Sequence, residues 1–499
     1  MMDRRAFLAI LAAAGVSALP GCQRRSDVSS AVDLALLDAT DQAALIERGE
    51  ISALEAVDAA IERIETVNPL LNAVITTDYE RAQDRARSVA SGQFRGVPSL
   101  LKDLNAYKGM RFTRGSAAFI DAVADSQAPY TDRIEEMGVV ILGKTNTPEF
   151  GLLPTTEPLA LGPTRNPWDK NYMAGGSSGG TAAAIAARMV PMAQGSDGGG
   201  SIRIPAAMCG IFGLKPTRGR FPDQGYGNRV YPLSIKNMMS ISVRDSALAL
   251  ALTESGAEDG LLPPVGFATP GDTGPLKIAV SMTTNIGEMP HPEIEGAILE
   301  AAGMLESMGH EIIMTEDSPL ADQDFFDQFL VIWSKGTADV FDYIAYASGI
   351  DPRVSGVLEP STIWLAETFK AMPVEALPAA IKKMVMVTQS VDEWFGQYDA
   401  WLTPVTAAPA QAIGWFSPDI ARETMIERVT RFAGYTQIHN AAGTPAMSVP
   451  MGLSQKGLPL AVQLSSRTGR EDLLLKLAYA FEEAKPWAGL LPPTSAVEI

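Results

Sequence analysis

Two serines in glycine-rich surroundings carry the chemistry that this sequence suggests most directly. Ser177 lies in the sequence GGSSGG at 175–180, and Ser201 ends the sequence DGGGS at 197–201. Glycine admits positive φ and lets a substrate approach the main chain closely. Successive backbone N–H groups beside Ser201 can converge on one point, which is the geometry of an oxyanion hole next to a nucleophile.

The segment between the two serines predicts how they are positioned. Residues 181–193 are rich in alanine, with Ile185, Met189 and Met192 as larger apolar members. This pattern predicts a buried helix. We therefore expect Ser177 at a turn just before a helix and Ser201 at a turn after it.

The stretch 175–215 resembles the signature of the amidase signature family of serine hydrolases, because GGSSGG is followed by GSDGGGSIRIPAAMCGIFGLK. Members of that family use a serine, a second serine preceded by a cis peptide bond, and a lysine, without histidine. The lysine should lie upstream in a Gly-Val-Pro-x-x-x-Lys-Asp setting, which residues 96–103 supply. The resemblance therefore implies Ser201 as the nucleophile, Ser177 as the bridging serine and Lys102 as the base.

The likeness extends from about Asp38 to Trp487 and implies further roles around the triad. Backbone N–H groups would hold the oxyanion, namely those of Gly198, Gly199, Gly200 and Ser201. Three side chains would brace the two turns, namely Ser178, Asp197 and Arg203. Asp197 and Arg203 are equally well explained as a purely structural ion pair. Many relatives carry Ile, Thr or Ala at the position of Gly198.

Lys102 can act as a base only when its amine is neutral, although a free lysine has a pKa of about 10.4. Burial in an apolar site lowers the pKa of a lysine, and Val97, Leu100 and Leu101 are consistent with such a site. A carboxylate beside the amine would raise it again. We therefore expect Asp103 to point away from Lys102.

Within the family, several segments resemble bacterial amidases of the 6-aminohexanoate cyclic dimer hydrolase type. They are residues 38–40, 46–52, 143–149, 164–168, 469–475 and 486–487. This likeness implies hydrolysis of a small linear or cyclic amide, or of a short peptide-like substrate, through an acyl-enzyme on Ser201. No cofactor is implied, and the expected partner is a small-molecule amide.

Composition and pattern predict an α/β protein with a large core. The chain has 499 residues, of which 46% are hydrophobic and 20% charged. Short apolar strands alternate with helical patterns, so we expect the amidase-signature fold, a mixed central β-sheet covered by helices on both faces. Residues 32–494 are expected to form a single amidase domain. Residues 321–423 form its variable lid and pocket region, with Trp333 as a pocket residue among several aromatics.

The first residues are typical of an export signal. Arg4 and Arg5 form a twin-arginine start, and an apolar run at 6–20 is too short to span a membrane. Residues 1–21 are therefore predicted to direct export to the periplasm or cell envelope, and residues 22–31 to form a tether. The end of the run resembles a lipoprotein cleavage site, which would leave Cys22 acylated and attached to a membrane. The alternative is an uncleaved anchor.

Other chemistries fit the sequence less well. The net charge of −18 disfavours nucleic acid, and no histidine pair or cysteine cluster predicts a metal site. A Ser-His-Asp site is disfavoured because His291, His310 and His439 lie outside any Gly-x-Ser-x-Gly setting. Cys209 is predicted to be a buried small hydrophobe.

Two other functions stay open on the sequence alone. An amidotransferase-type subunit shares the signature, but the export signal and acidic charge argue against it. A catalytically silent surface lipoprotein that binds peptides or amides belongs to another class, and the three triad residues speak against it.

Overall fold

This computed structural model describes residues 34–88, 91–221, 231–256, 262–284 and 286–499. Its strands form three hydrogen-bonded ladders. In chain order the strands are β1 (Val74–Thr77), β2 (Pro98–Lys102), β3 (Val140–Thr145), β4 (Met192–Asp197), β5 (Gly213–Lys215), β6 (Ile235–Ser240), β7 (Lys277–Val280), β8 (Glu311–Met314), β9 (Ala400–Pro404), β10 (Ala446–Leu453) and β11 (Pro459–Ser466). The ladders run β1-β3-β2, β4-β6 and β5-β10-β11-β9-β7-β8.

Bonds at the ladder edges join the three ladders into one layer. Ser99 Oγ of β2 donates to Met192 O of β4 at 3.0 Å. An isolated antiparallel bridge between Phe212 and Ser240 connects β6 with the region of β5. The pairs β2–β3, β7–β8 and β7–β9 are parallel, and the remaining pairs are antiparallel. The predicted mixed sheet is confirmed.

Helices lie on both faces of this layer. They are α3 (Ala39–Glu47), α4 (Ala53–Leu71), α5 (Tyr79–Ser88), α6 (Pro129–Glu136), α7 (Gly179–Ala186), α8 (Arg203–Cys209), α9 (Val243–Thr253), α10 (Pro292–Ser307), α11 (Phe325–Ser348), α12 (Pro352–Ser355), α13 (Pro360–Lys370), α14 (Ala376–Trp394), α15 (Arg422–Ala433), α16 (Gln437–Ala442) and α17 (Glu471–Ala484). Short 3-10 turns are η1 (Ala117–Phe119), η2 (Glu149–Gly151) and η3 (Pro319–Ala321). The sequence prediction of an α/β protein is therefore confirmed.

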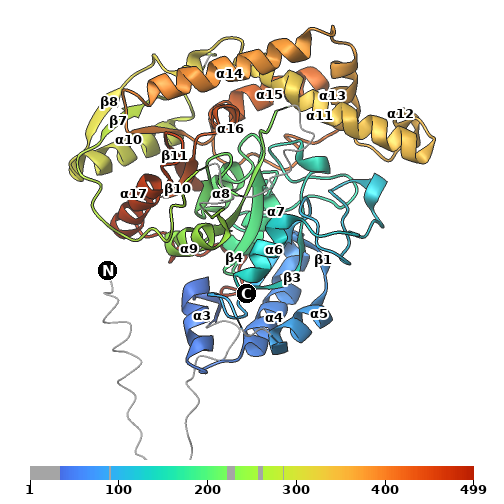
Figure 1. The fold of residues 1–499 in the computed structure, drawn as a ribbon, viewed down its shortest axis with the longest axis vertical. Coiled ribbons are helices and arrows are strands. Elements are labelled where there is room, and N and C mark those ends of the chain that lie inside the picture. Colours follow the sequence, from blue (N-terminus) through green and yellow to red (C-terminus); the bar gives the residue numbers. More distant parts are fainter. Residues whose placement is uncertain (1–33, 89–90, 222–230, 257–261, 285) are drawn as a thin grey trace, which may run out of the picture.

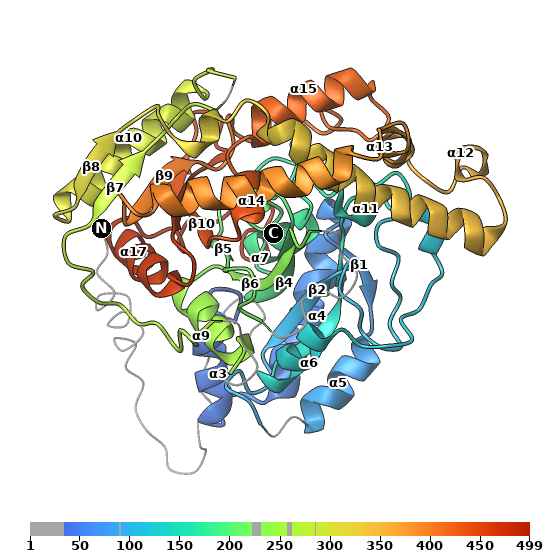
Figure 2. The ribbon, with the colours of Figure 1, turned by 45° about the horizontal axis from the view of Figure 1, so that its top comes forward.

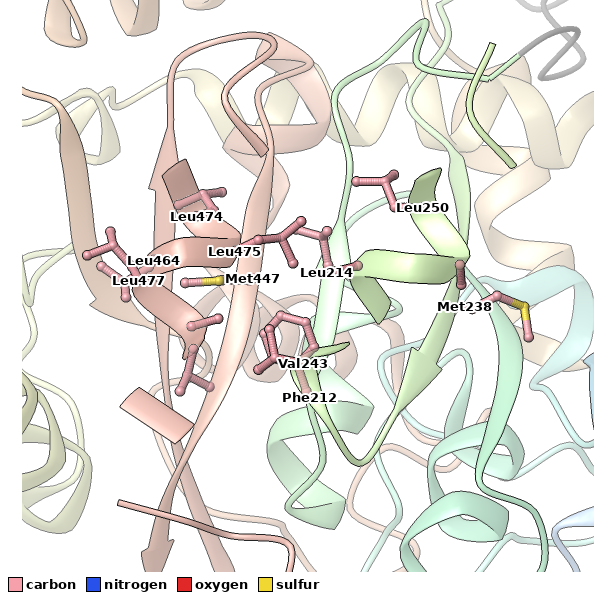
Figure 3. Packing of buried hydrophobic residues seen from close by; sticks show 14 of the residues in the cluster. Phe212, Leu214, Met238, Val243, Leu250, Met447, Leu464, Leu474, Leu475 and Leu477 are labelled. Carbon is pink, nitrogen blue, oxygen red and sulfur yellow. The ribbon is translucent and has the colours of Figure 1, made fainter. Parts of the chain in front are cut away.

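Alternating side chains divide the core between the two faces, as expected for buried strands. In β9, Leu402 packs toward α9, α10 and α17, whereas Trp401 packs toward α11, α14 and α16. In β2, Leu101 belongs to the same core cluster as Leu402, whereas Leu100 belongs to the cluster that contains side chains of α4 and α7. Figure 3 shows the first of these clusters, where Leu475 and its neighbours from α17 meet strands β5 and β10.

The helices of the predicted lid region gather at one end of the molecule. Figures 1 and 2 show α11, α13, α14 and α15 together at this end, while α3, α4 and α5 lie at the other. The segment 321–423 is not all lid, however, because it also contains the fully buried strand β9 of the six-stranded ladder.

The helix predicted at 181–193 is wrong in its second half. The helix α7 ends at Ala186, and Arg188 adopts a left-handed backbone with φ 62°. Pro191 follows, which cannot continue a helix, and β4 then begins at Met192. Ser201 therefore follows a strand and precedes α8, rather than following a helix directly.

The predicted export signal (1–21), the tether (22–31) and Cys22 lie outside the described residues. In the part of the chain that is described, no helix combines the length and apolar character needed to cross a membrane. Cys209 is buried, as predicted.

A buried carboxylate fastens the lid helices to the core. Glu149 in η2 accepts hydrogen bonds from Ser116 Oγ at 2.6 Å, from the backbone N–H of Glu359 at 2.9 Å, and from Thr362 Oγ1. Glu359 is the residue before α13, and its own carboxylate accepts from the Leu159 N–H at 2.7 Å. Two carboxyl groups therefore lie buried at the start of α13.

Burial raises the pKa of Glu359 to about 8, and the neighbouring charge of Glu149 adds to the effect. The stabilising contribution of protonated Glu359 is complete below its unfolded-state pKa near 4.5 and is lost as the pH rises toward 8. We predict that wild type loses about 2–4 kcal/mol more unfolding free energy than Glu359→Gln between pH 5 and pH 8.5. Urea denaturation at both pH values measures this. The exposed Glu367→Gln variant should behave as wild type, and an identical pH dependence in Glu359→Gln would contradict the assignment.

Candidate active site

Lys102 ends strand β2 in the interior of the sheet, with its side chain fully buried. Its backbone N–H donates to Gln194 Oε1 of β4 at 3.1 Å, which holds the end of the strand in place. The amine Nζ donates to Ser177 Oγ at 2.6 Å and to Ser196 Oγ at 3.0 Å. The structure therefore brings Lys102 and Ser177 into direct contact across 75 residues of sequence.

Burial lowers the pKa of Lys102 to about 7, against the opposing charge of Asp197, which raises it. A lysine with this pKa is largely neutral just above pH 7 and can accept a proton. Asp103 points away, as expected: its carboxylate accepts from Thr113 N at 2.9 Å and from Arg114 N at 3.1 Å.

Ser177 lies in a turn that can be formed only with glycine at position 176. The peptide bond between Gly176 and Ser177 is cis, as the resemblance implied. A Cβ atom on Gly176 would overlap the backbone of Thr155. On the other side of the turn, Thr156 Oγ1 donates to Gly175 O and accepts from Gly179 N, both at 3.0 Å. The turn is therefore fixed from both sides before α7 begins.

Ser201 lies beside this turn, between β4 and α8. Its carbonyl oxygen accepts from Ser178 N at 3.2 Å, so the two serine turns are bonded to each other. Ser178 Oγ donates to Ser196 O at 3.1 Å and binds β4 as well. Ser201 Oγ forms no hydrogen bond with Ser177 or with any other described residue. Bonds between a nucleophile and its base often tighten only when substrate binds.

Asp197 and Arg203 form a fully buried pair on either side of the glycine run. Two guanidinium nitrogens, Nε and Nη2, bind the two carboxylate oxygens at 3.0 and 2.9 Å. The remaining donors reach Thr436 O, Gln463 Oε1 and Asn440 Oδ1 at 2.7–2.9 Å. Burial alone would raise the pKa of Asp197, but the charge and hydrogen bonds of Arg203 hold it well below its usual range. All the hydrogen-bonding capacity of Arg203 is therefore used, and it ties Asp197 to Thr436, Asn440 and Gln463.

The backbone N–H groups of the glycine run differ in availability. Gly200 N donates to Asp197 Oδ1 at 2.7 Å, so it is already paired. Gly200 also has φ +127°, and a Cβ there would overlap Thr436. The N–H groups of Gly198, Gly199 and Ser201 donate to no described residue. Of the four N–H groups implied by the resemblance, these three are free to bind an oxyanion.

Ser201 opens into a cavity whose lining carries no charged side chain. Phe329 and Trp333 of α11 stack on each other, with centroids 5.6 Å apart, and form one wall. A Cβ on Gly198 would lie 3.2 Å from the Trp333 ring, so the glycine leaves room for the indole. Trp333 therefore lines the pocket, as predicted.

The other aromatics singled out from the sequence divide between pocket and core. Phe326 and Trp364 line the cavity. Phe325, Phe341 and Trp394 are buried in the core instead, and Tyr343 is exposed. Their positions in the sequence do not distinguish the aromatics that line the cavity from those that are buried in the core or exposed.

The histidines do not contact either serine. His439 is buried with Nδ1 3.0 Å from Thr444 Oγ1, and burial holds its pKa well below the usual value. His291 precedes α10, and His310 lies between α10 and β8. Within the described ranges, no group of three or more His, Cys, Asp or Glu side chains could hold a metal ion.

Sequence reasoning missed several residues of this site. Ser196 shares the amine of Lys102 with Ser177, and only its position just before Asp197 could have indicated it. Phe329 and Gln437 line the cavity from α11 and α16. Nothing in the local sequence marks these two, because they lie more than 120 residues beyond Ser201 and meet it only through the fold.

Known proteins resemble this chain over most of its length. A family model described as Amidase matches residues 55–475. The putative amidase AmiC of Mycobacterium tuberculosis (strain ATCC 25618 / H37Rv) is 37% identical over 480 residues, covering 94% of this chain and 100% of the relative. The 6-aminohexanoate-cyclic-dimer hydrolase of Pseudomonas sp. (strain NK87) is 34% identical over 476 residues, covering 91% and 96%.

Solved structures of amidase signature enzymes also resemble this chain. A structure of 6-aminohexanoate cyclic dimer hydrolase aligns with a TM-score of 0.85 at 32% identity, covering 92% of this chain and 99% of that chain. A bacterial aryl acylamidase of the amidase signature family aligns with a TM-score of 0.82 at 27% identity, covering 91% and 97%. The chain therefore belongs to the amidase signature family. It is an amidase, and the predicted amidase-signature fold is confirmed.

The Asp197–Arg203 pair leads to a prediction on stability. Lysine at 203 would keep the charge but could not reach all the acceptors of the guanidinium fork. We predict that Arg203→Lys lowers the free energy of unfolding by about 3 kcal/mol, because buried acceptors lose their partners. Urea denaturation measures this, with the exposed Arg85→Lys as a control that should match wild type. A stability change below about 0.5 kcal/mol in Arg203→Lys would show that the network is dispensable.

Proposed function

We propose that this amidase hydrolyses a small neutral carboxylic amide through an acyl-enzyme on Ser201, with Ser177 as proton relay and Lys102 as base. The observation that carries the proposal is the 2.6 Å contact between Ser177 Oγ and a fully buried Lys102 amine. A neutral amine in that place can draw the proton from Ser177, which in turn can accept one from Ser201.

The acylation step balances within these three residues. Ser201 Oγ bonds to the carbonyl carbon while its proton passes to Ser177 Oγ, whose own proton passes to Lys102 Nζ. When the carbon–nitrogen bond breaks, a proton returns along the same path to the leaving amine. Water then attacks the ester on Ser201, the carboxylic acid leaves, and Ser201 regains its proton.

Backbone donors supply the charge stabilisation that this step needs. The N–H groups of Gly198, Gly199 and Ser201 are the free donors beside the nucleophile, and the Asp197–Arg203 pair holds their loop. Donors that are fixed before the reaction stabilise the developing oxyanion without reorganisation.

The cavity supports a small and uncharged acyl group. Its volume is about 80 Å³. A cavity needs about 10–15 Å³ to hold one water molecule, so this one has room for a small acyl group. An ionised group would lose its hydration without finding an opposite charge in the lining. This also argues against an amidotransferase-type subunit, because a glutamine substrate would bring both an ammonium and a carboxylate into the pocket.

The test is amide hydrolysis by the purified chain. We expect hydrolysis of neutral anilides such as pentanoyl 4-nitroanilide, with release of pentanoate and 4-nitroaniline, and at least about a thousandfold loss of kcat/KM in Ser201→Ala. The exposed Ser307→Ala is the matched control and should keep wild-type activity. Absence of hydrolysis across a panel of neutral amides, by a folded wild type, would favour the silent binding lipoprotein instead.

A further inference from the structure

The cavity beside Ser201 contains very few polar side-chain groups. Apart from the nucleophile, its lining residues with nitrogen or oxygen in the side chain are Trp333, Trp364 and Gln437. Trp333 Nε1 already donates to Leu152 O at 3.3 Å. Trp364 Nε1 is buried and has no partner, but it can only donate one hydrogen bond. Gln437 is the one side chain of this group that can both donate and accept.

Gln437 is 4% exposed, and its buried amide oxygen has no hydrogen-bond partner among the described residues. Exchanging the amide oxygen and nitrogen would not change this, because both ends lack a partner. Neighbouring polar groups are paired: Thr436 Oγ1 donates to Gly199 O at 2.6 Å, and Asn440 Nδ2 donates to Asp197 Oδ1 at 2.9 Å. The two polar side chains Thr436 and Asn440 on this segment are therefore satisfied by the glycine loop, whereas Gln437 is not.

The position of this amide places it next to the reacting group. Gln437 starts α16 and packs against the glycine run, since a Cβ on Gly199 would lie 3.5 Å from Gln437 Cγ. Gly199 precedes Ser201 by two residues and has one of the free N–H groups. A substrate whose carbonyl lies against these N–H groups would place the first atoms of its acyl part beside Gln437.

We propose that Gln437 determines acyl specificity by hydrogen bonding to a second, neutral amide in the acyl part of the substrate. This inference rests on the proposed function. A carboxamide has one donor end and one acceptor end, and another amide is complementary to both. Leaving a buried amide unpaired costs free energy, so an acyl group without the second amide binds less well. The absence of charge in the lining excludes an ionised group in this role.

The experiment compares two substrates of equal length in two enzymes. N-acetylglycyl 4-nitroanilide carries the second amide, and pentanoyl 4-nitroanilide replaces it with methylenes. Gln437→Met keeps the size of the side chain and removes its hydrogen bonds, while Gln455→Leu at an exposed position is the control. The readout is the ratio of kcat/KM values for the two substrates, in which their intrinsic reactivities cancel between enzymes.

We expect the ratio of N-acetylglycyl to pentanoyl hydrolysis to fall about tenfold in Gln437→Met, with pentanoyl hydrolysis retained and the control unchanged. Retained pentanoyl hydrolysis also shows that the variant is folded. An equal loss on both substrates, or an unchanged ratio, would overturn the inference while leaving the proposed function intact. If wild type hydrolyses neither anilide, the proposed function fails, and this inference fails with it.

Discussion

A lysine kept neutral inside the protein is the constraint on which the rest of the site depends. Lys102 is fully buried, and burial lowers its pKa to about 7. The opposing influence is Asp197, whose negative charge raises that pKa. Arg203 binds both oxygens of Asp197 and compensates this charge. The same ion pair thus positions the glycine run and limits the effect of Asp197 on Lys102.

The fold brings these groups together from distant parts of the chain. Strand β2 supplies Lys102, and the turns before α7 and after β4 supply the two serines. The segment around α16 holds the glycine run through hydrogen bonds from Thr436 to Gly199 and from Asn440 to Asp197. Helix α11 then covers the glycine run with Phe329 and Trp333. The lid helix α11 can therefore pack directly on the core at Gly198 and Gly199, because these residues have no side chain.

The sequence was sufficient for the parts of the site that are encoded locally. The serines, the lysine and the glycines stand in short motifs, and the cis bond at Gly176–Ser177 accompanied the resemblance. The capping box of Ser52 and Glu55 at the start of α4 is another motif that is encoded locally. The error at 181–193 arose because the apolar run continues from α7 through the turn at Arg188 into β4, and an apolar run alone does not distinguish a buried helix from a buried strand. Pro191 was the only local sign of the change.

The remaining features depend on contacts that no local pattern records. Whether Gly200 N–H is free depends on the position of the Asp197 carboxylate, and here the two are bonded. Gln437 could not be assigned to the pocket, because its sequence neighbours are ordinary buried helix residues. Which aromatics line the cavity was decided by the packing of α13 and α14 over the core, as Trp364 of α13 and Trp394 of α14 illustrate.

The pH dependence of nucleophile labelling would test the role of Lys102 most directly. Intact mass would follow the rate at which a fluorophosphonate forms a single adduct, with Ser201→Ala confirming the site. In wild type the rate should rise with pH through about 7, as Lys102 loses its proton and becomes able to accept one. In Lys102→Met, labelling should be slow and nearly independent of pH over the same range. Labelling of Lys102→Met at the wild-type rate and with the wild-type pH profile would contradict the role of Lys102 as the base.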